Sequence, residues 1–399
     1  MRFPAFQHRN FRLFWTGNVF SLVGTLAQDA ARGWLVRGLT PDPLAISMVA
    51  ACGSIPILLL TLYAGAIADR VDKRRGLLLT NILAMVLALV LAALTYWNVI
   101  SVWSLAFLSL FAGTVNAFDI PIRQSMNIEM VGREDLPNAI ALNSTAFNGA
   151  RVAGPAVGGL LIHWFGVAGC FALNAASFLA LIFGLRKMDL PPSEPNKRGA
   201  GLSEIREGFC FVRSHPVLWP TTLLVAVCSL FALSFGTLMP VFAKDVFGTD
   251  ARGFSALLTA SGAGALVSAA SLAVAGSMRH KGKRLLGGAL LFCVCVVGFA
   301  FSPNLFWACL WLFASGFCLL TFLTTANTLV QTTAPDDLRG RVFSLYSLAL
   351  IGAGPLGALW TGGAAKILGP RQGVAAGAVL AAIWTVGTFW KCPALWKEK

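Results

Sequence analysis

The chain has 399 residues, of which 57% are hydrophobic and 12% charged, and its mean hydropathy is +0.73. A soluble domain carries about 25% charged residues. A soluble protein is therefore excluded, and a single membrane anchor is excluded too, because the apolar residues recur along the whole chain. The formal net charge of +14 would suit a nucleic-acid-binding protein unless the positions of the bases argue otherwise.

Twelve apolar runs are long enough to cross a bilayer as helices. They lie at 11–37, 44–68, 76–97, 101–126, 137–163, 167–187, 217–244, 252–277, 285–302, 304–332, 341–366 and 371–390. The sequence thus predicts an all-α membrane protein with two six-helix bundles, 1–187 and 217–399. A polar cytoplasmic linker, 188–216, separates them, and the amphipathic pattern of 202–212 predicts a short interfacial helix within it.

The bases lie mainly on one side of this predicted topology. If the chain starts inside the cell, 24 of its 31 Lys and Arg fall in the two termini and alternate loops. The opposite side holds Arg37, Lys244, Arg252, Lys366 and Arg371. This asymmetry is the positive-inside pattern, which predicts cytoplasmic termini and argues against nucleic acid as a partner.

The two halves of the chain repeat one another. The acidic stretch before span 5, 134–136, matches 336–338 before span 11, and the Gly-Pro element at 154–155 matches 354–355. Such a repeat of six helices is typical of transporters, because the halves can rock about a site between them. A channel or a membrane sensor, the alternative from another class, has no comparable need for the repeat.

Four spans carry polar residues at helical spacing. In span 1 these are Asn18, Ser21, Thr25, Asp29 and Arg32; in span 4, Asn116, Asp119, Arg123 and Asn127; in span 5, Ser144, Asn148 and Arg151; in span 10, Thr321, Thr325, Thr328 and Thr332. An ionisable residue left in lipid costs roughly 3 kcal/mol or more, so these faces should meet a bundle interior or a water-filled cavity.

The charged residues in these spans also allow a structural interpretation. Asp29 could simply neutralise Arg32, three residues on, and Asp119 could neutralise Arg123, four residues on. Arg151 has no such neighbour and needs a partner from another helix, for which Asp29 and Asp119 are the candidate acids.

The loop between spans 2 and 3 resembles that of the major facilitator superfamily. Its order is Gly65-x-x-x-Asp69-Arg70-x-x-Lys73-Arg74-Arg75, with Asp72 where the family usually has glycine. The stretches 117–124, 136–144 and 335–344 are similar to the branch that contains the enterobactin exporter and macrolide efflux permeases. The resemblance covers nearly the whole chain, and it implies a monomeric, multi-pass transporter of the bacterial inner membrane, not an enzyme.

The resemblance also implies roles for particular residues. Spans 1, 4, 7 and 10 line the cavity in this superfamily, which makes Asn18, Thr25, Asp29, Arg32, Asn116, Asp119, Arg123, Asn148, Arg151, Thr325 and Thr328 candidates for substrate binding or coupling. The candidate cytoplasmic gate is Gly65, Asp69, Arg70, Lys73, Arg74, Arg75, Arg339 and Arg341. Gly154, Pro155, Gly158 and Gly159 resemble an antiporter element and are expected to pack or bend span 5.

The expected function is export of an amphipathic small molecule, of the drug or siderophore class, by alternating access. Import or facilitated movement by the same fold is the alternative. No ATP-binding signature is present in the sequence, so a gradient is the expected energy source and the proton a candidate coupling ion. The arginine that many proton-coupled antiporters carry in span 4 is replaced by Ser109, which makes Asp29 the better proton candidate. We expect no metal or cofactor.

Overall fold

The computed structural model describes residues 4–68, 71–189, 202–275, 280–335 and 338–396. Within these ranges every regular element is a helix, which confirms the predicted fold class. By their contacts the residues form two units, 1–40 with 52–199 and 41–51 with 200–399. The start of the second helix therefore groups with the second unit, and the remainder of that helix with the first.

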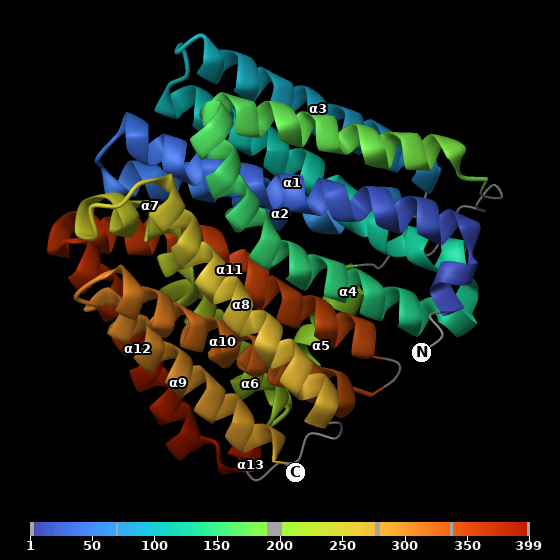
Figure 1. Cartoon of the computed structure of the whole chain (residues 1–399). Helices are drawn as coiled ribbons and strands as arrows, with labels where there is room; N and C mark the ends of the chain where they lie inside the picture. Colours follow the sequence, from blue (N-terminus) through green and yellow to red (C-terminus); the bar gives the residue numbers. More distant parts are fainter. Residues whose placement is uncertain (1–3, 69–70, 190–201, 276–279, 336–337, 397–399) are drawn as a thin grey trace. The chain divides into compact units, whose positions relative to one another are not determined.

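The first unit is built from long helices (Figure 1). They are α1 (Arg9–Leu39), α2 (Pro43–Ala68, from residue 52 on), α3 (Lys73–Tyr96) and α4 (Val102–Lys187), preceded by the short 3-10 turn η1 (Pro4–Gln7). Asp72 begins α3 as its N-cap, since its carboxylate accepts the backbone N–H of Arg75 at 2.9 Å. At the position where the family usually has glycine, this chain thus has a side chain that caps the helix.

The single ribbon of α4 contains three of the predicted spans. Its backbone leaves the helical conformation at Gly132 (φ 73°) and Gly166 (φ 71°). A positive φ of this kind is readily adopted only by glycine. The three segments, 102–131, 133–165 and 167–187, correspond to predicted spans 4, 5 and 6.

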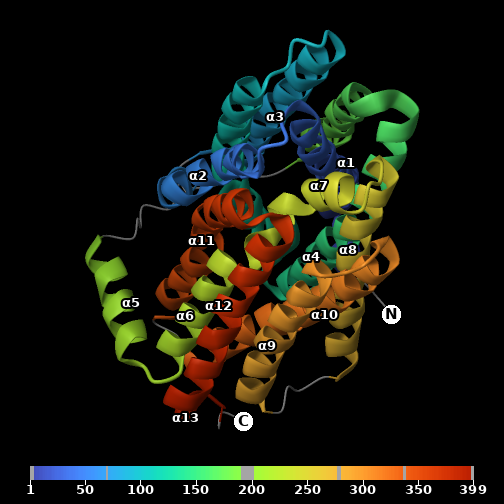
Figure 2. The ribbon, with the colours of Figure 1, turned by 90° about the vertical axis from the view of Figure 1, so that its left-hand side faces the viewer.

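Apart from the start of α2, the second unit begins with the α5 helix, which is joined to α6 by a short turn (Figure 2). Its elements are α5 (Leu202–Ser214), α6 (Leu218–Phe231), η2 (Leu233–Leu238), α7 (Met239–Val241), η3 (Phe242–Val246), α8 (Ala251–Ala275), α9 (Lys281–Ala300), α10 (Leu305–Thr333), α11 (Arg339–Leu368), α12 (Pro370–Lys391) and α13 (Pro393–Trp396). α9 lies beside α10 and α12, as both views show.

Each unit has its own apolar core. In the first, Phe11 and Phe14 of α1 are fully buried with Leu77 of α3 and Met126 of α4. In the second, the ring of Phe299 lies 4.6 Å from that of Phe242 and 5.7 Å from that of Phe235. Ten stretches of the described chain are long and apolar enough to span a membrane. One of them, 134–187, contains two spans separated at Gly166, and α1 with its charged pair completes the predicted set.

Candidate functional site

A buried hydrogen-bonded network joins three helices inside the first unit. Asp119 of α4 is only 9% exposed, and its carboxylate accepts from Thr80 Oγ1 (2.7 Å) and Asn81 Nδ2 (3.2 Å) of α3. Arg123, one turn along α4, places Nη2 2.7 Å from Asp119 Oδ2 and donates through Nη1 to Asn18 of α1. Both oxygens of the Asp119 carboxylate are thus engaged by α3 and α4, so the acid contributes to the packing of the unit.

The second acid, Asp29, is in a different environment. Arg32 Nη2 lies 3.0 Å from Asp29 Oδ1, but the Asp29 side chain remains 45% exposed, against 13% for that of Asp119. The neighbouring Gln28 accepts a hydrogen bond from Asn174 of α4 (2.9 Å) and so fixes this turn of α1. A carboxylate facing lipid at this depth would be costly. The exposed side of Asp29 is therefore suited to a water-filled face.

Arg151, in the 133–165 segment of α4, has neither of the partners considered from the sequence. Its side chain is half-buried and makes no hydrogen bond or ion pair with any described residue. Asp29 and Asp119 instead pair with the arginines of their own helices. Asn148, one turn before, donates to the carbonyl of Ser144 at 2.9 Å. Arg151 thus brings a positive charge into a membrane-spanning segment without an ion-pair partner among the described residues.

The remaining cavity candidates are less distinctive. Thr25 of α1 is half-buried and Asn116 of α4 is exposed. In α10, the hydroxyl of Thr325 donates to the carbonyl of Thr321 (2.7 Å), and that of Thr328 to the carbonyl of Thr324 (2.9 Å). These two hydroxyls are satisfied within their own helix, so binding a substrate donor would use only their free lone pairs.

The bases that follow α2 contact α4 within the first unit. Lys73 Nζ forms an ion pair with Glu129 of α4. Arg74 donates from Nε to the carbonyl of Leu185 (2.7 Å) and from Nη2 to that of Arg186 (2.6 Å). These are the last carbonyls of α4, which have no partner within the helix, so Arg74 acts as a C-terminal cap for it.

Two of the other gate candidates, Gly65 and Arg75, lie among the described residues. Gly65 lies in the last turn of α2 and is half-buried, whereas Arg75 is exposed and its Nε lies 4.0 Å from Asp72. Asp69 and Arg70 lie outside the described residues.

At the start of α11, Arg341 Nη1 lies 2.6 Å from Glu207 Oε2, which links α11 to α5 within the second unit. Arg339 belongs to the same turn, and its side chain is outside the described part of the chain.

The Gly-Pro element of α4 packs against α1. A Cβ added at Gly154 would lie 2.6 Å from Leu26 Cβ, and one at Gly158 would lie 3.0 Å from a carbonyl oxygen of α1. Pro155 and Gly159 are buried in the same stretch. The backbone stays helical at Pro155, and the breaks in α4 occur at its two positive-φ glycines instead.

A feature not expected from the sequence is the interruption of predicted span 7. The α-helix ends at Phe231, and the chain continues as short 3-10, α and π turns to Val246. Hydroxyls bond the backbone here: Ser234 donates to the carbonyl of Ser229 (3.0 Å), and Ser229 to that of Leu350 in α11 (2.6 Å). Interrupted helices often mark binding sites in transporters. The sequence signal is the pair of helix breakers, Gly236 and Pro240, which the apolar run conceals.

These features together define a class of protein. Membrane-spanning helices with an ionisable face on α1 and three bases at the start of α3 are features of a secondary transporter of the major facilitator superfamily. More narrowly, residues 2–398 match the family described as transmembrane secretion effector, and the chain belongs to that family. The resemblance stated from the sequence is thereby confirmed.

Several characterised transporters are similar to this chain in sequence over most of their length. The multidrug efflux pump Tap of Mycolicibacterium fortuitum is 28% identical over 346 residues, which cover 84% of each chain. The staphyloferrin A transporter of Staphylococcus aureus is 24% identical over 367 residues, 90% of each chain. The enterobactin exporter EntS of Shigella boydii is 24% identical over 318 residues, covering 77% of this chain and 74% of the exporter.

Solved structures show the same fold. A bacterial homologue of the human lysosomal transporter Spinster, inward-facing and unoccupied, superposes with a TM-score of 0.73 at 15% identity and 98% coverage of both chains. A POT family transporter in complex with a thioalcohol-conjugated peptide gives a TM-score of 0.76 at 12% identity, covering 97% of this chain and 96% of that one. At such low identity, the likeness concerns the fold alone.

Proposed function

We propose that this transporter exports an amphipathic small molecule of the drug or siderophore class across the bacterial inner membrane by alternating access. Support comes from the relatives, whose names describe a multidrug efflux pump, a staphyloferrin A transporter and an enterobactin exporter. Since the sequence has no ATP-binding signature, an ion gradient supplies the energy in this proposal.

The observation that carries the coupling proposal is the environment of Asp29. Asp29 Oδ1 lies 3.0 Å from Arg32 Nη2, yet the Asp29 side chain stays 45% exposed. Water can therefore reach this carboxylate, as proton transfer to and from a coupling acid requires. The carboxylate of Asp119 is instead held by Thr80, Asn81 and Arg123 in the unit interior, and its side chain is only 13% exposed.

Arg151 gives the proposal a substrate preference. A half-buried cation without a described partner is stabilised by any anion brought next to it, and the guanidinium suits carboxylate or phosphate groups in particular. We therefore infer that acidic amphipathic compounds bind better than their neutral analogues. Asn148 lies one turn away on the same face and can add a hydrogen bond.

The proposed cytoplasmic gate is the loop after α2. Asp69 would pair with a base of another helix, or with the N-terminal end of α11 near Arg339 and Arg341, when the inner side is closed. Asp69→Asn should then slow cycling while expression is retained. Unchanged transport by that variant would remove Asp69 from the gate.

The decisive experiment uses purified protein in proteoliposomes with an imposed pH gradient. Dyes, antibiotics and siderophores are first screened by their accumulation in cells with and without the gene. For the compound so identified, Asp29→Asn should abolish gradient-driven transport while substrate binding survives. Asp29→Glu is the matched control, because it keeps the titratable group. Normal gradient-driven transport by a well-folded Asp29→Asn protein would exclude the coupling role.

Direction and orientation require their own measurements. Higher accumulation of the compound in cells lacking the gene indicates export, and lower accumulation indicates the alternative, import or facilitated entry. Cytoplasmic termini and a cytoplasmic linker predict that a cysteine introduced at Asn196 is shielded from an impermeant thiol reagent in intact cells. Labelling from outside would overturn this topology. A single-subunit mass in detergent is expected for the proposed monomer.

A further inference from the structure

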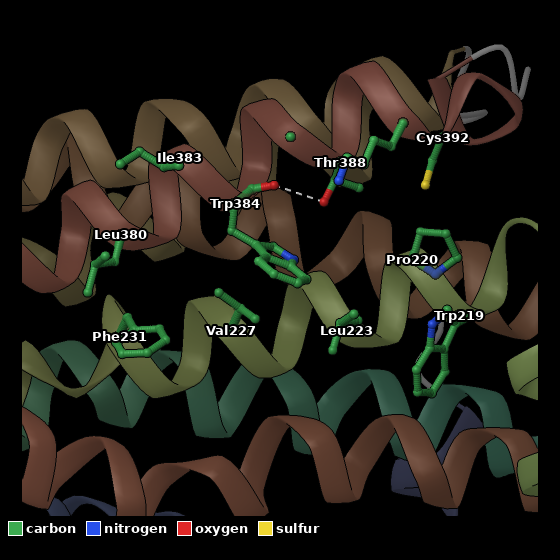
Figure 3. A pocket seen from close by; sticks show the side chains of 12 residues that line it. Trp219, Pro220, Leu223, Val227, Phe231, Leu380, Ile383, Trp384, Thr388 and Cys392 are labelled. Carbon is green, nitrogen blue, oxygen red and sulfur yellow. Dashed lines mark hydrogen bonds between the residues drawn. The ribbon is translucent and has the colours of Figure 1, made fainter.

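An open groove lies on the second unit between α6 and α12 (Figure 3). Its volume is about 540 Å³. The residues that line it come from one face of each helix: Trp219, Pro220, Leu223, Val227 and Phe231 from α6, and Leu380, Ile383, Trp384, Gly387, Thr388 and Lys391 from α12, with Cys392 just beyond. The groove belongs entirely to this unit and includes none of the residues in the proposed transport site.

The surroundings of the groove are those of a membrane-spanning surface. The stretch Leu218–Val246, which begins with α6, and the helix α12 are each long and apolar enough to cross a bilayer. Leu380, Ile383 and Trp384 are exposed by 41%, 63% and 42% of their surface. Trp384 reaches from α12 towards α6, with Val227 and Leu223 opposite (Figure 3). Side chains of this kind at a span surface pack against hydrocarbon, so the groove is shaped for an acyl chain.

One end of the groove carries polar groups. Lys391, in the last turn of α12, is exposed and makes no ion pair with a described residue. Trp219 lies at the end near Cys392 (Figure 3), and its indole N–H donates to no acceptor in the described chain. The hydroxyl of Thr388 is already used, since it donates to the carbonyl of Trp384 at 2.9 Å. A ligand group for this end should therefore be an acceptor and negatively charged.

An anionic phospholipid meets both requirements. We propose that the groove binds a phospholipid such as phosphatidylglycerol, with one acyl chain between α6 and α12 and the phosphate at Lys391. A phosphodiester has acceptor oxygens and no donor. Its charge complements the ammonium, as in the basic pockets between helices that bind anionic headgroups. Trp219, at the same end, matches the amphipathic residues that occupy the headgroup level of membrane proteins.

The experiment compares phosphatidylglycerol with phosphatidylcholine, which carries the same phosphate but no net charge. Purified protein is equilibrated with equal amounts of the two lipids in detergent, and the retained lipids are counted by native mass spectrometry. One lysine near the membrane surface corresponds to about a fivefold preference for the anionic lipid. Lys391→Met should remove this preference. The control Lys283→Met, which loses the same charge at the exposed start of α9, should keep it.

A second pair of measurements tests the groove itself. Leu223→Trp fills the groove without changing its charge and should lower the retention of both lipids. In membranes, bromine-labelled phosphatidylglycerol should quench the fluorescence of Trp384, measured as the difference between the native protein and Trp384→Phe, more than the labelled phosphatidylcholine does. Equal retention of both lipids by the native protein, an unchanged preference in Lys391→Met, full retention by Leu223→Trp, or equal quenching would overturn the proposal.

Discussion

Arg123 and Asp119, one turn apart in α4, form an ion pair in which two guanidinium nitrogens approach one carboxylate oxygen. Arg123 Nη2 lies 2.7 Å and Nε 2.8 Å from Asp119 Oδ2. The pair is not isolated. Thr80 adds a hydrogen bond to the other carboxylate oxygen, and the guanidinium also lies 5.7 Å from the ring centre of Phe14. A charge pair linked in this way to α1 and α3 stabilises the unit, because removing one member leaves the other buried without a partner.

Asp119→Ala should therefore destabilise the protein by about 3–5 kcal/mol, the cost of breaking a buried pair. Asp119→Asn, which keeps an acceptor for Thr80, should lose less. Thermal unfolding in detergent measures both. A full-stability Asp119→Ala protein that fails to transport would show instead that this acid acts in the transport cycle.

Arg151→Gln should weaken the binding of acidic substrates roughly tenfold or more, the loss expected when a hydrogen bond to a charged group is removed. Neutral members of the same compound series should bind as before. Arg151→Lys keeps the charge and should recover part of the loss, and stability should not fall, since Arg151 makes no bond to a described residue. Equal weakening for acidic and neutral compounds would argue against anion recognition.

Gly154→Ala should destabilise the first unit by about 1–3 kcal/mol, the range found when extra atoms are forced into a packed interior. The added methyl group would lie 2.6 Å from Leu26 Cβ. Gly149→Ala is the matched control in the same segment of α4, because a Cβ there meets nothing within 4 Å. That variant should be as stable as the native protein or more so, since alanine is the better helix former. Equal melting temperatures for the two variants would contradict the packing role.

Asp42→Asn should reduce stability slightly at neutral pH and not at all in strong acid. Lys366 Nζ lies 2.9 Å from Asp42 Oδ2 within the second unit, and its hydrogen bond lowers the pKa of Asp42 below the ordinary 3.8. A carboxyl group whose pKa is lower in the folded than in the unfolded state stabilises the folded protein at pH values above its unfolded-state pKa. This contribution is lost as the pH falls through its folded-state pKa. The Lys366 side chain is 53% exposed and that of Asp42 35%. Because solvent screens such a pair, its contribution to stability should stay below about 1 kcal/mol.

Melting temperatures of native protein and Asp42→Asn across the acid range measure this effect, with Lys366→Met as the reciprocal variant. The difference between native and variant proteins should shrink as the pH falls below 3.8. A difference independent of pH would exclude the ion pair as its source.

The sequence by itself determined the spans. Crossing a bilayer requires about 20 consecutive, mainly apolar residues, and such a run can be recognised from neighbouring residues alone. The observed bounds, such as Arg9–Leu39 for predicted 11–37 and Leu305–Thr333 for 304–332, differ by a few residues. The local pairs Asp29–Arg32 and Asp119–Arg123 could likewise be foreseen from helical spacing.

Only the tertiary structure decided which of these groups is engaged and which remains free. The links from Asp119 to Thr80 and from Arg123 to Asn18 join residues 39 and 105 positions apart. They depend on how each helix is rotated and shifted along its neighbours, which no local pattern contains. The same holds for Arg151, which has no partner in the part of the chain that the structure describes, and for the groove between α6 and α12. Periodicity shows that residues share a face of a helix, but the packing of other helices decides what that face meets.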